Sequence, residues 1–212
     1  MNTTRYREFM PNFLTLLNLS FGFSSIILSI EGQYGKAAFL ILGAVIVDST
    51  DGFIARRLRV GSQMGMELDS LADFLSFCIA PAILFYHLYR IEYWVLLLLL
   101  PICGALRLAR FNANTTQKEY FTGLPTTTAG GFLASITLIK PFNSNHALIL
   151  TILLSLLMVS NLKYKNFKNL GTGKHAKTFL IGLATVSLSL IDVKWIFTPF
   201  LTYMILGIKT KN

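Results

Sequence analysis

The sequence has little charge. Only 14% of its 212 residues are Asp, Glu, Lys or Arg, whereas soluble globular proteins carry about 25%. Hydrophobic residues make up 53% of the chain, and its mean hydropathy is +0.58. This composition excludes an ordinary soluble domain and a disordered, solvating chain. The apolar runs, such as 94–101 and 147–159, are continuous, whereas barrel strands alternate apolar and polar residues. We therefore expect an all-α integral membrane protein.

Cysteine is scarce as well. Cys78 and Cys103 both fall in apolar segments, and their spacing matches neither a metal-binding box nor a disulfide framework. We expect both to be small buried side chains. The net charge of +9 does not indicate a nucleic-acid partner, because the 17 Phe lie mostly in apolar runs rather than among the basic residues. The basic residues are instead expected to contact anionic membrane lipids.

Eight apolar segments are candidates for crossing a bilayer, which takes about 20 residues. They are 12–30, 36–58, 65–87, 92–110, 124–140, 145–162, 176–191 and 193–208. The first six predict a bundle of six core transmembrane helices over 12–162. The last two are shorter and predict a C-terminal helix pair that follows a basic loop, together 163–212. Because the segments leave no room for a soluble domain, we expect residues 1–212 to form a single membrane domain.

The 19 basic residues predict an orientation. If the N-terminus is cytoplasmic and the segments alternate, 15 Lys and Arg fall on the cytoplasmic side and 4 on the outer side. Cytoplasmic loops are the ones enriched in basic residues. We therefore expect an even number of spans, with the N and C termini in the cytoplasm of a multi-pass protein of the plasma or inner membrane.

Four of the ten acidic residues lie inside the second and third apolar segments: Asp48, Asp51, Asp69 and Asp73. Spacings of three and four place each pair on one face of its helix, and the short connection makes the two helices antiparallel neighbours. A carboxylate within a membrane helix costs about 2.5–3.5 kcal/mol, so cations are needed. Carboxylate oxygens suit Mg²⁺, Mn²⁺ or Ca²⁺. Two such ions would balance four charges, which predicts a two-metal site.

Structural ion pairs with Arg56, Arg57 or Arg59, or a proton relay, are the alternatives for these aspartates. Gly52 and other small residues favour a ligand instead, since they leave one helix face bare for close approach. A guanidinium such as that of Arg56 can grip a phosphate with two hydrogen bonds. The pattern favours a site for metal and phosphate at the membrane interface.

The same residues resemble the signature of the CDP-alcohol phosphatidyltransferase family. Eight positions match at the family's spacing: Asp48, Asp51, Gly52, Ala55, Arg56, Gly65, Asp69 and Asp73. The resemblance implies a six-helix core, usually in a homodimer, whose site opens to the cytoplasm and the lipid. It also implies the transfer of a phosphatidyl group from a CDP-lipid to an alcohol.

Site roles follow from the resemblance. It implies that Asp48, Asp51 and Asp69 bind one divalent ion, that Asp48, Asp69 and Asp73 bind a second, and that Asp73 is also the general base. Gly52, Arg56 and Ser62 are expected to contact the CDP-alcohol, by the same resemblance. From the first helix, Asn12 and Thr15 are expected to contact the nucleotide, the alternative being a helix cap and an interhelical hydrogen bond.

Four further segments resemble the bacterial and archaeal phosphatidylserine synthases within this family: 11–18, 69–81, 104–112 and 121–125. They imply L-serine as the acceptor. We expect Arg110 or Arg107, with Asn112 nearby, to bind the serine carboxylate, the alternative being membrane anchoring by the two arginines. The chain departs from the family at Cys78, where many relatives have glycine, and at 126–128, where they tend to have proline and alanine. Neither departure touches the metal signature.

Other functions remain open at this point. The same chemistry could use glycerol 3-phosphate or an inositol phosphate as acceptor, and these would require a larger cationic pocket. A divalent-cation transporter is an alternative of a different class, with the aspartates as its transport site. The sequence also leaves open whether the CDP-lipid is a diacylglycerol or an archaeal diether.

Overall fold

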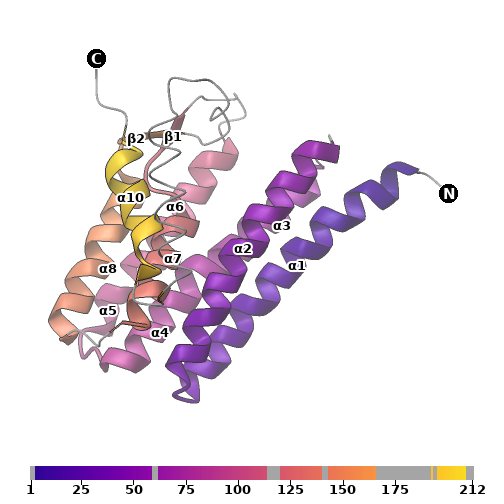
Figure 1. The fold of residues 1–212 in the computed structure, drawn as a ribbon. Coiled ribbons are helices and arrows are strands. Elements are labelled where there is room, and N and C mark those ends of the chain that lie inside the picture. Colours follow the sequence, from indigo (N-terminus) through magenta and orange to yellow (C-terminus); the bar gives the residue numbers. More distant parts are fainter. Residues whose placement is uncertain are drawn as a thin grey trace.

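A computed structural model describes residues 3–58, 62–113, 120–139, 143–165, 192 and 195–208. They form a bundle of helices with one small sheet at its end (Figure 1), which confirms the expected helical architecture. The elements are α1 (Thr3–Ile30), α2 (Tyr34–Leu58), α3 (Gln63–Phe74), the π-helical segment η1 (Leu75–Ile79), α4 (Ala80–Tyr89), α5 (Trp94–Leu97), α6 (Leu99–Ala113), β1 (Tyr120–Thr122), α7 (Thr126–Thr137), α8 (Ser144–Val159), β2 (Lys163–Lys165) and α10 (Thr198–Leu206).

Within the described residues, four helical stretches are long and apolar enough to cross a membrane: Asn12–Ile30, Tyr34–Ile54, Gln63–Tyr89 and Trp94–Ala113. They correspond to the first four predicted spans. The fifth and sixth predicted spans form the shorter helices α7 and α8, of 12 and 16 residues. The seventh, 176–191, lies outside the described residues, and α10 covers 9 residues of the eighth. The count of eight spans and the cytoplasmic termini stay predictions.

The helices alternate in direction. Figure 1 shows that α1 starts at one end of the bundle and that α2, α6 and α8 finish at that same end. An isolated bridge between Tyr164 and Ile208 brings the chain two residues after α10 back to this end as well. This alternation is the one that the distribution of basic residues assumed. Which end faces the cytoplasm stays a prediction.

Residues 63–89 form one continuous helix, in which α3, η1 and α4 follow each other without a break. Its middle widens into the single π-helical turn η1. Such turns are rare and occur frequently at functional sites. The start of this helix is capped by Ser62, whose Oγ accepts a hydrogen bond from the Gly65 N–H at 3.0 Å.

Three neighbouring helices approach η1 at successive residues, and each does so through a glycine. A Cβ atom added to any of these glycines would collide with η1. The three contacts are Gly22 of α1 against Ser76, Gly130 of α7 against Phe77, and Gly104 of α6 against Cys78. The π-helical turn is therefore a point where three helices of the bundle pack closely against a fourth.

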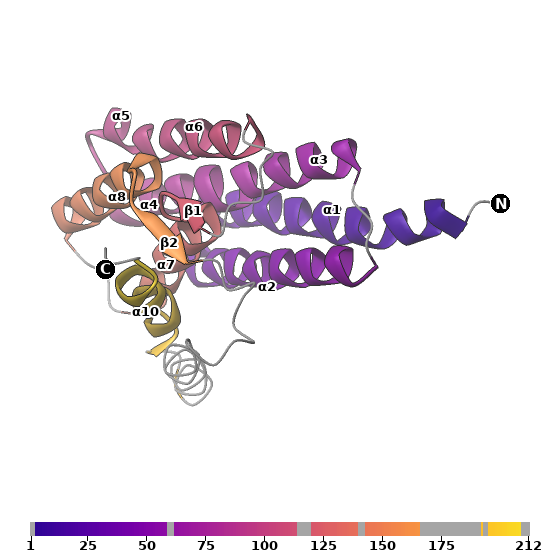
Figure 2. The same ribbon diagram turned by 90° about the horizontal axis from the view of Figure 1, so that it is seen from above.

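Further contacts between helices complete the bundle. Helix α1 also packs along α2, α7 packs on α2, and α6 packs on α3 and α8. Figure 2 shows α10 outside this bundle, on the side of α7, where Phe200 lies against Gly131. At the end of the bundle β1 pairs antiparallel with β2, and the buried Tyr164 of β2 stacks on Tyr203 of α10 with ring centroids 5.8 Å apart.

We predict that Gly130→Ala destabilises the protein by about 1–3 kcal/mol, in the range for overpacked cores. The added Cβ would lie 2.7 Å from the Cα and the carbonyl oxygen of Phe77, and backbone atoms cannot move aside as a flexible side chain can. The measurement is the thermal unfolding midpoint in detergent. Gly35→Ala is the matched control, because its Cβ would meet nothing within 4 Å. Equal midpoints for the two variants would contradict the close approach of α7 to η1.

Candidate functional site

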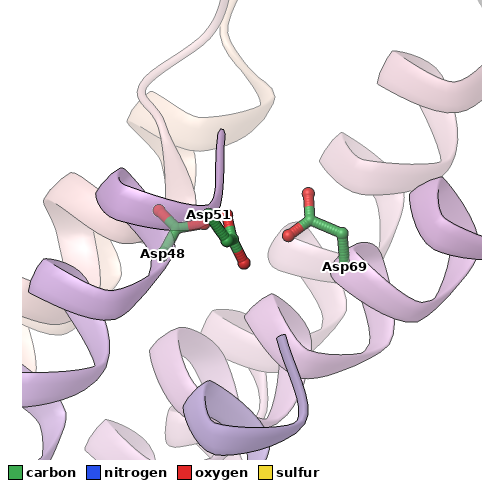
Figure 3. Close-up of side chains that lie close together, drawn as sticks. All are labelled: Asp48, Asp51 and Asp69. Carbon is green, nitrogen blue, oxygen red and sulfur yellow. The ribbon is translucent and has the colours of Figure 1, made fainter. Parts of the chain in front are cut away.

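Three of the four predicted aspartates converge between α2 and α3. Figure 3 shows Asp48 and Asp51 on one helix, facing Asp69 on the other. One carboxylate oxygen from each residue lies within 4.8 Å of the others. We call these three residues the aspartate trio. The predicted convergence of these three carboxylates is found, but α2 and α3 are not a closely packed pair of neighbours, because α1 packs against both of them.

The trio fits a divalent cation. Its donors are carboxylate oxygens, which Mg²⁺, Mn²⁺ and Ca²⁺ prefer. Asp69 Oδ1 is buried and has no hydrogen-bond partner. A buried acceptor without a partner costs free energy unless a ligand satisfies it. The trio can therefore hold a metal ion, and the orphaned oxygen of Asp69 is where such an ion would be coordinated.

Hydroxyl groups hold the two α2 aspartates. Thr15 Oγ1 of α1 donates to Asp51 Oδ2 at 3.1 Å, and both residues are buried. Thr127 Oγ1 of α7 donates to Asp48 Oδ2 at 3.3 Å. Such outer hydrogen bonds orient metal ligands. For Thr15 the structure thus shows the interhelical hydrogen bond considered as the alternative to a nucleotide contact.

The contact of Thr127 corrects one sequence-based expectation. The departure at 126–128 was expected not to touch the metal signature, yet Thr127 contacts Asp48, and Thr126 Oγ1 accepts from Arg107 Nη1 at 3.4 Å. Thr127 is 79 residues from Asp48 in the sequence. A long-range contact of this kind depends on how α7 packs against α2, and no local pattern in the sequence signals it.

Asp73 lies one turn beyond Asp69 on α3, about 6 Å further along the helix axis. It is buried and lies outside the trio. The trio's carboxylates repel it, and the guanidinium of Arg107 attracts it. Its Oδ1 accepts a hydrogen bond from Asn18 Nδ2 at 3.4 Å. The buried carboxylate of Asp73 thus interacts electrostatically with both the acidic trio and the buried guanidinium of Arg107.

The structure describes some of the residues expected to contact the CDP-alcohol more fully than others. Asn12 Oδ1 and Ser62 Oγ each lie 3.2 Å from the position that a Cβ on Gly65 would occupy, so α1 and the start of α3 meet there. Gly52 is half-buried on α2. Only the backbone of Arg56 is described, and its side chain lies outside the described residues. These roles stay predictions.

The three residues expected to bind serine have different partners. The guanidinium of Arg110 donates to the carbonyl oxygens of Thr122 at 2.9 Å and Val159 at 3.3 Å, which ties the end of α6 to β1 and to the end of α8. Asn112 Nδ2 donates to Ser70 Oγ at 3.0 Å and so joins α6 to α3. Arg107 alone of the three is buried, and it is the one that attracts Asp73.

Together, the apolar helices and the acidic trio define a membrane protein with a candidate site for divalent ions. Sequence comparison gives its family. Residues 8–159 match the profile described as CDP-alcohol phosphatidyltransferase. Because the match covers more than half of the chain, the protein belongs to the CDP-alcohol phosphatidyltransferase family, and it is an enzyme. The resemblance seen in the sequence is thereby confirmed.

Curated relatives occur in archaea and in bacteria. The chain is 38% identical to the archaetidylserine synthase of Methanothermobacter thermautotrophicus over 81% of its own length and 76% of that protein. It is 32% identical to the CDP-diacylglycerol–serine O-phosphatidyltransferase of Helicobacter pylori, over 93% and 89% of the two chains. It is 41% identical to the enzyme of the same name from Mycobacterium leprae, over 56% of its own length and 43% of that protein.

We predict that Mn²⁺ raises the thermal midpoint of the wild type and that Asp69→Asn abolishes this rise. A ligand that binds only the folded state stabilises it by about 2.7 kcal/mol at a hundred times its Kd, and Asp69 offers the trio's orphaned oxygen. Glu92→Gln is the control, because Glu92 is an exposed carboxylate outside the trio. An equal response of wild type and Asp69→Asn would rule out a metal site at the trio.

Proposed function

We propose that this protein transfers a phosphatidyl group from a CDP-lipid to the hydroxyl of L-serine, releasing CMP. The main observation in its favour is the aspartate trio, with the buried carboxylate of Asp73 one turn further along α3 and the buried guanidinium of Arg107 on α6. The trio suits a pyrophosphate with its metal ions, and the pair suits a small acceptor that carries both a hydroxyl and a carboxylate. The names of the relatives, which specify serine, support this acceptor.

Asp48, Asp51 and Asp69 would hold one divalent ion, and Asp48, Asp69 and Asp73 a second. Mg²⁺ or Mn²⁺ fits these oxygen donors, and Ca²⁺ is also compatible. When bound, such ions supply the positive charge that neutralises a pyrophosphate and its leaving group. Thr15 and Thr127 keep Asp51 and Asp48 turned toward this position through their hydroxyl groups.

Asp73 is the proposed general base. The serine hydroxyl is a weak nucleophile. A carboxylate must therefore take the hydroxyl proton while the serine oxygen attacks the lipid-side β-phosphorus. The new bond joins the serine oxygen to phosphorus, and the bond from that phosphorus to the bridging oxygen breaks, so that CMP leaves with the electron pair. Asp73 is buried one turn beyond the trio, where it can face the acceptor while the trio faces the pyrophosphate.

Arg107 is the proposed partner of the serine carboxylate. Its guanidinium is buried, and its Nε has no hydrogen-bond partner. Leaving this N–H buried without an acceptor is costly, and a substrate carboxylate would satisfy it. Of the two arginines expected to serve this role, Arg110 has its guanidinium bonded to backbone carbonyls, so the geometry favours Arg107.

The remaining substrate contacts belong to the same proposal. Gly52 lets the pyrophosphate approach α2, and Arg56 binds one of its phosphates. Asn12 of α1 and Ser62 at the start of α3 lie close together and are proposed to contact the nucleotide, while Thr15 holds Asp51. We propose that this end of the bundle faces the cytoplasm, where CDP-lipid headgroups and serine meet, and that the enzyme is a homodimer.

The decisive experiment is CMP release by purified protein in detergent with CDP-diacylglycerol, Mn²⁺ and one candidate alcohol at a time. We expect release to require L-serine, to stop when EDTA removes the metal, and to be lost in Asp73→Asn while CDP-lipid binding is retained. Faster release with glycerol 3-phosphate or an inositol phosphate would change the acceptor. Metal-dependent ion flux in liposomes without CMP release would replace the proposal with a transporter.

Two conservative substitutions separate the roles of the arginines. We predict that Arg107→Lys raises the KM for serine by tenfold or more, since a lost charged hydrogen bond costs about 1.5–3 kcal/mol, and leaves the KM for CDP-lipid unchanged. Arg110→Lys loses the fork that bridges the carbonyls of Thr122 and Val159, so it should lower the thermal midpoint and leave the KM for serine unchanged. The reverse pattern would assign serine binding to Arg110.

A further inference from the structure

Asn18 of α1 is a buried polar residue beside the proposed base. Its side chain has no exposed surface. Its Nδ2 donates to Asp73 Oδ1 at 3.4 Å. Its backbone carbonyl oxygen accepts a hydrogen bond from Ser76 Oγ at 3.0 Å. Asn18 thus contacts two residues of the helix 63–89 that lie three positions apart.

The amide of Asn18 is held in one orientation. An ionised carboxylate can only accept hydrogen bonds, so the NH₂ group must face Asp73. The amide oxygen then points elsewhere, and Oδ1 is buried without a partner. An unsatisfied buried acceptor lowers stability. An apolar side chain of the same size would avoid that cost, so stability alone does not account for an asparagine here.

The second contact of Asn18 reaches η1. Ser76 lies in this π-helical segment, and Gly22, one turn beyond Asn18 on α1, packs directly against Ser76. Helix α1 therefore meets the helix that carries Asp73 both at the carboxylate and at the turn that follows it. This two-point contact fixes where the carboxylate of Asp73 lies relative to α1.

We propose that Asn18 is a positioning residue, which holds the carboxylate of Asp73 in the orientation needed to take the proton of the acceptor hydroxyl. This role rests on the proposed function of Asp73. A general base must lie within hydrogen-bond distance, about 2.6–3.2 Å between heavy atoms, of the hydroxyl oxygen whose proton it removes. A carboxylate free to rotate about its side-chain bonds would spend less time in that geometry.

The role predicts a specific kinetic pattern. Because positioning acts on the chemical step, Asn18→Leu should lower kcat by roughly tenfold to a hundredfold, within the total that general base catalysis supplies. The KM values for CDP-lipid and serine should stay within about twofold, since neither substrate loses a binding contact. The thermal midpoint should not fall much, because leucine removes the unsatisfied amide oxygen together with the hydrogen bond to Asp73.

The test compares wild type, Asn18→Leu, Asn18→Ser and Ser155→Ala. Serine retains a polar group at position 18 but is too short to replace the amide donor. Ser155→Ala is the control for losing a buried hydrogen bond, because Ser155 is fully buried on α8 and donates to the carbonyl of Thr151 at 2.7 Å. Each variant is assayed for kcat and KM by CMP release with L-serine, for CDP-diacylglycerol binding, and for its thermal midpoint.

The positioning role is supported if both Asn18 variants have a lower kcat but keep their affinity for CDP-diacylglycerol. Their thermal midpoints should be no lower than that of Ser155→Ala, and this control should keep the wild-type kcat. It is overturned if either Asn18 variant keeps wild-type kcat, or if kcat falls only in parallel with CDP-diacylglycerol affinity or the thermal midpoint. If the wild type releases no CMP with serine, the proposed function is wrong, and the proposed positioning of its general base is wrong as well. An active wild type with active Asn18 variants refutes positioning alone.

Discussion

The contact of three helices with η1 is the constraint on which the rest of the site depends. Residues 76–78 each meet a glycine from a different helix, and no side chain fits between them. These contacts set the distances of α1, α6 and α7 from the helix that carries Asp69 and Asp73. Each of the three helices brings a polar residue to the site: Asn18, Arg107 and Thr127.

Electrostatics explains why so many polar contacts gather there. Carboxylates inside an apolar bundle repel one another and lose their hydration. The structure compensates with hydroxyl donors to Asp48 and Asp51, an amide donor to Asp73, and the nearby charge of Arg107. These groups carry one positive charge against four negative ones, so the balance still favours added cations. This imbalance is the physical basis for metal binding in the site.

Local rules were enough to predict part of this arrangement. Spacings of three and four residues and a short connection predicted that Asp48, Asp51 and Asp69 would converge, and they do. Arg107 and Arg110 are also three residues apart, and this spacing places them on the same side of α6. Residues three apart still point about 60° away from each other around the helix. Arg107 therefore has the buried carboxylate of Asp73 as a neighbour, whereas Arg110 has the backbone of β1 and α8.

Other features depend on tertiary packing and could not be predicted. The π-helical turn has no local signal in the run from Leu75 to Ile79, and its position becomes clear only from the three glycines around it. The contact of Thr127 with Asp48 requires α7 to lie on α2. Within the described part of the eighth candidate segment, 193–208, α10 spans 9 residues.

The hydrogen bond that Thr127 of α7 donates to Asp48 of α2 has a consequence for biosynthesis. Chains are made from the N-terminus, so α2 and α3 are synthesised well before Thr127 and Arg107. During that interval the nascent membrane segment carries its aspartates without the hydroxyl and the guanidinium that later surround them. Early metal capture, or entry into the bilayer with protonated carboxyls, would lower the cost of this unfinished stage. The acidic helices α2 and α3 are therefore made before the groups that surround their carboxylates in the folded protein.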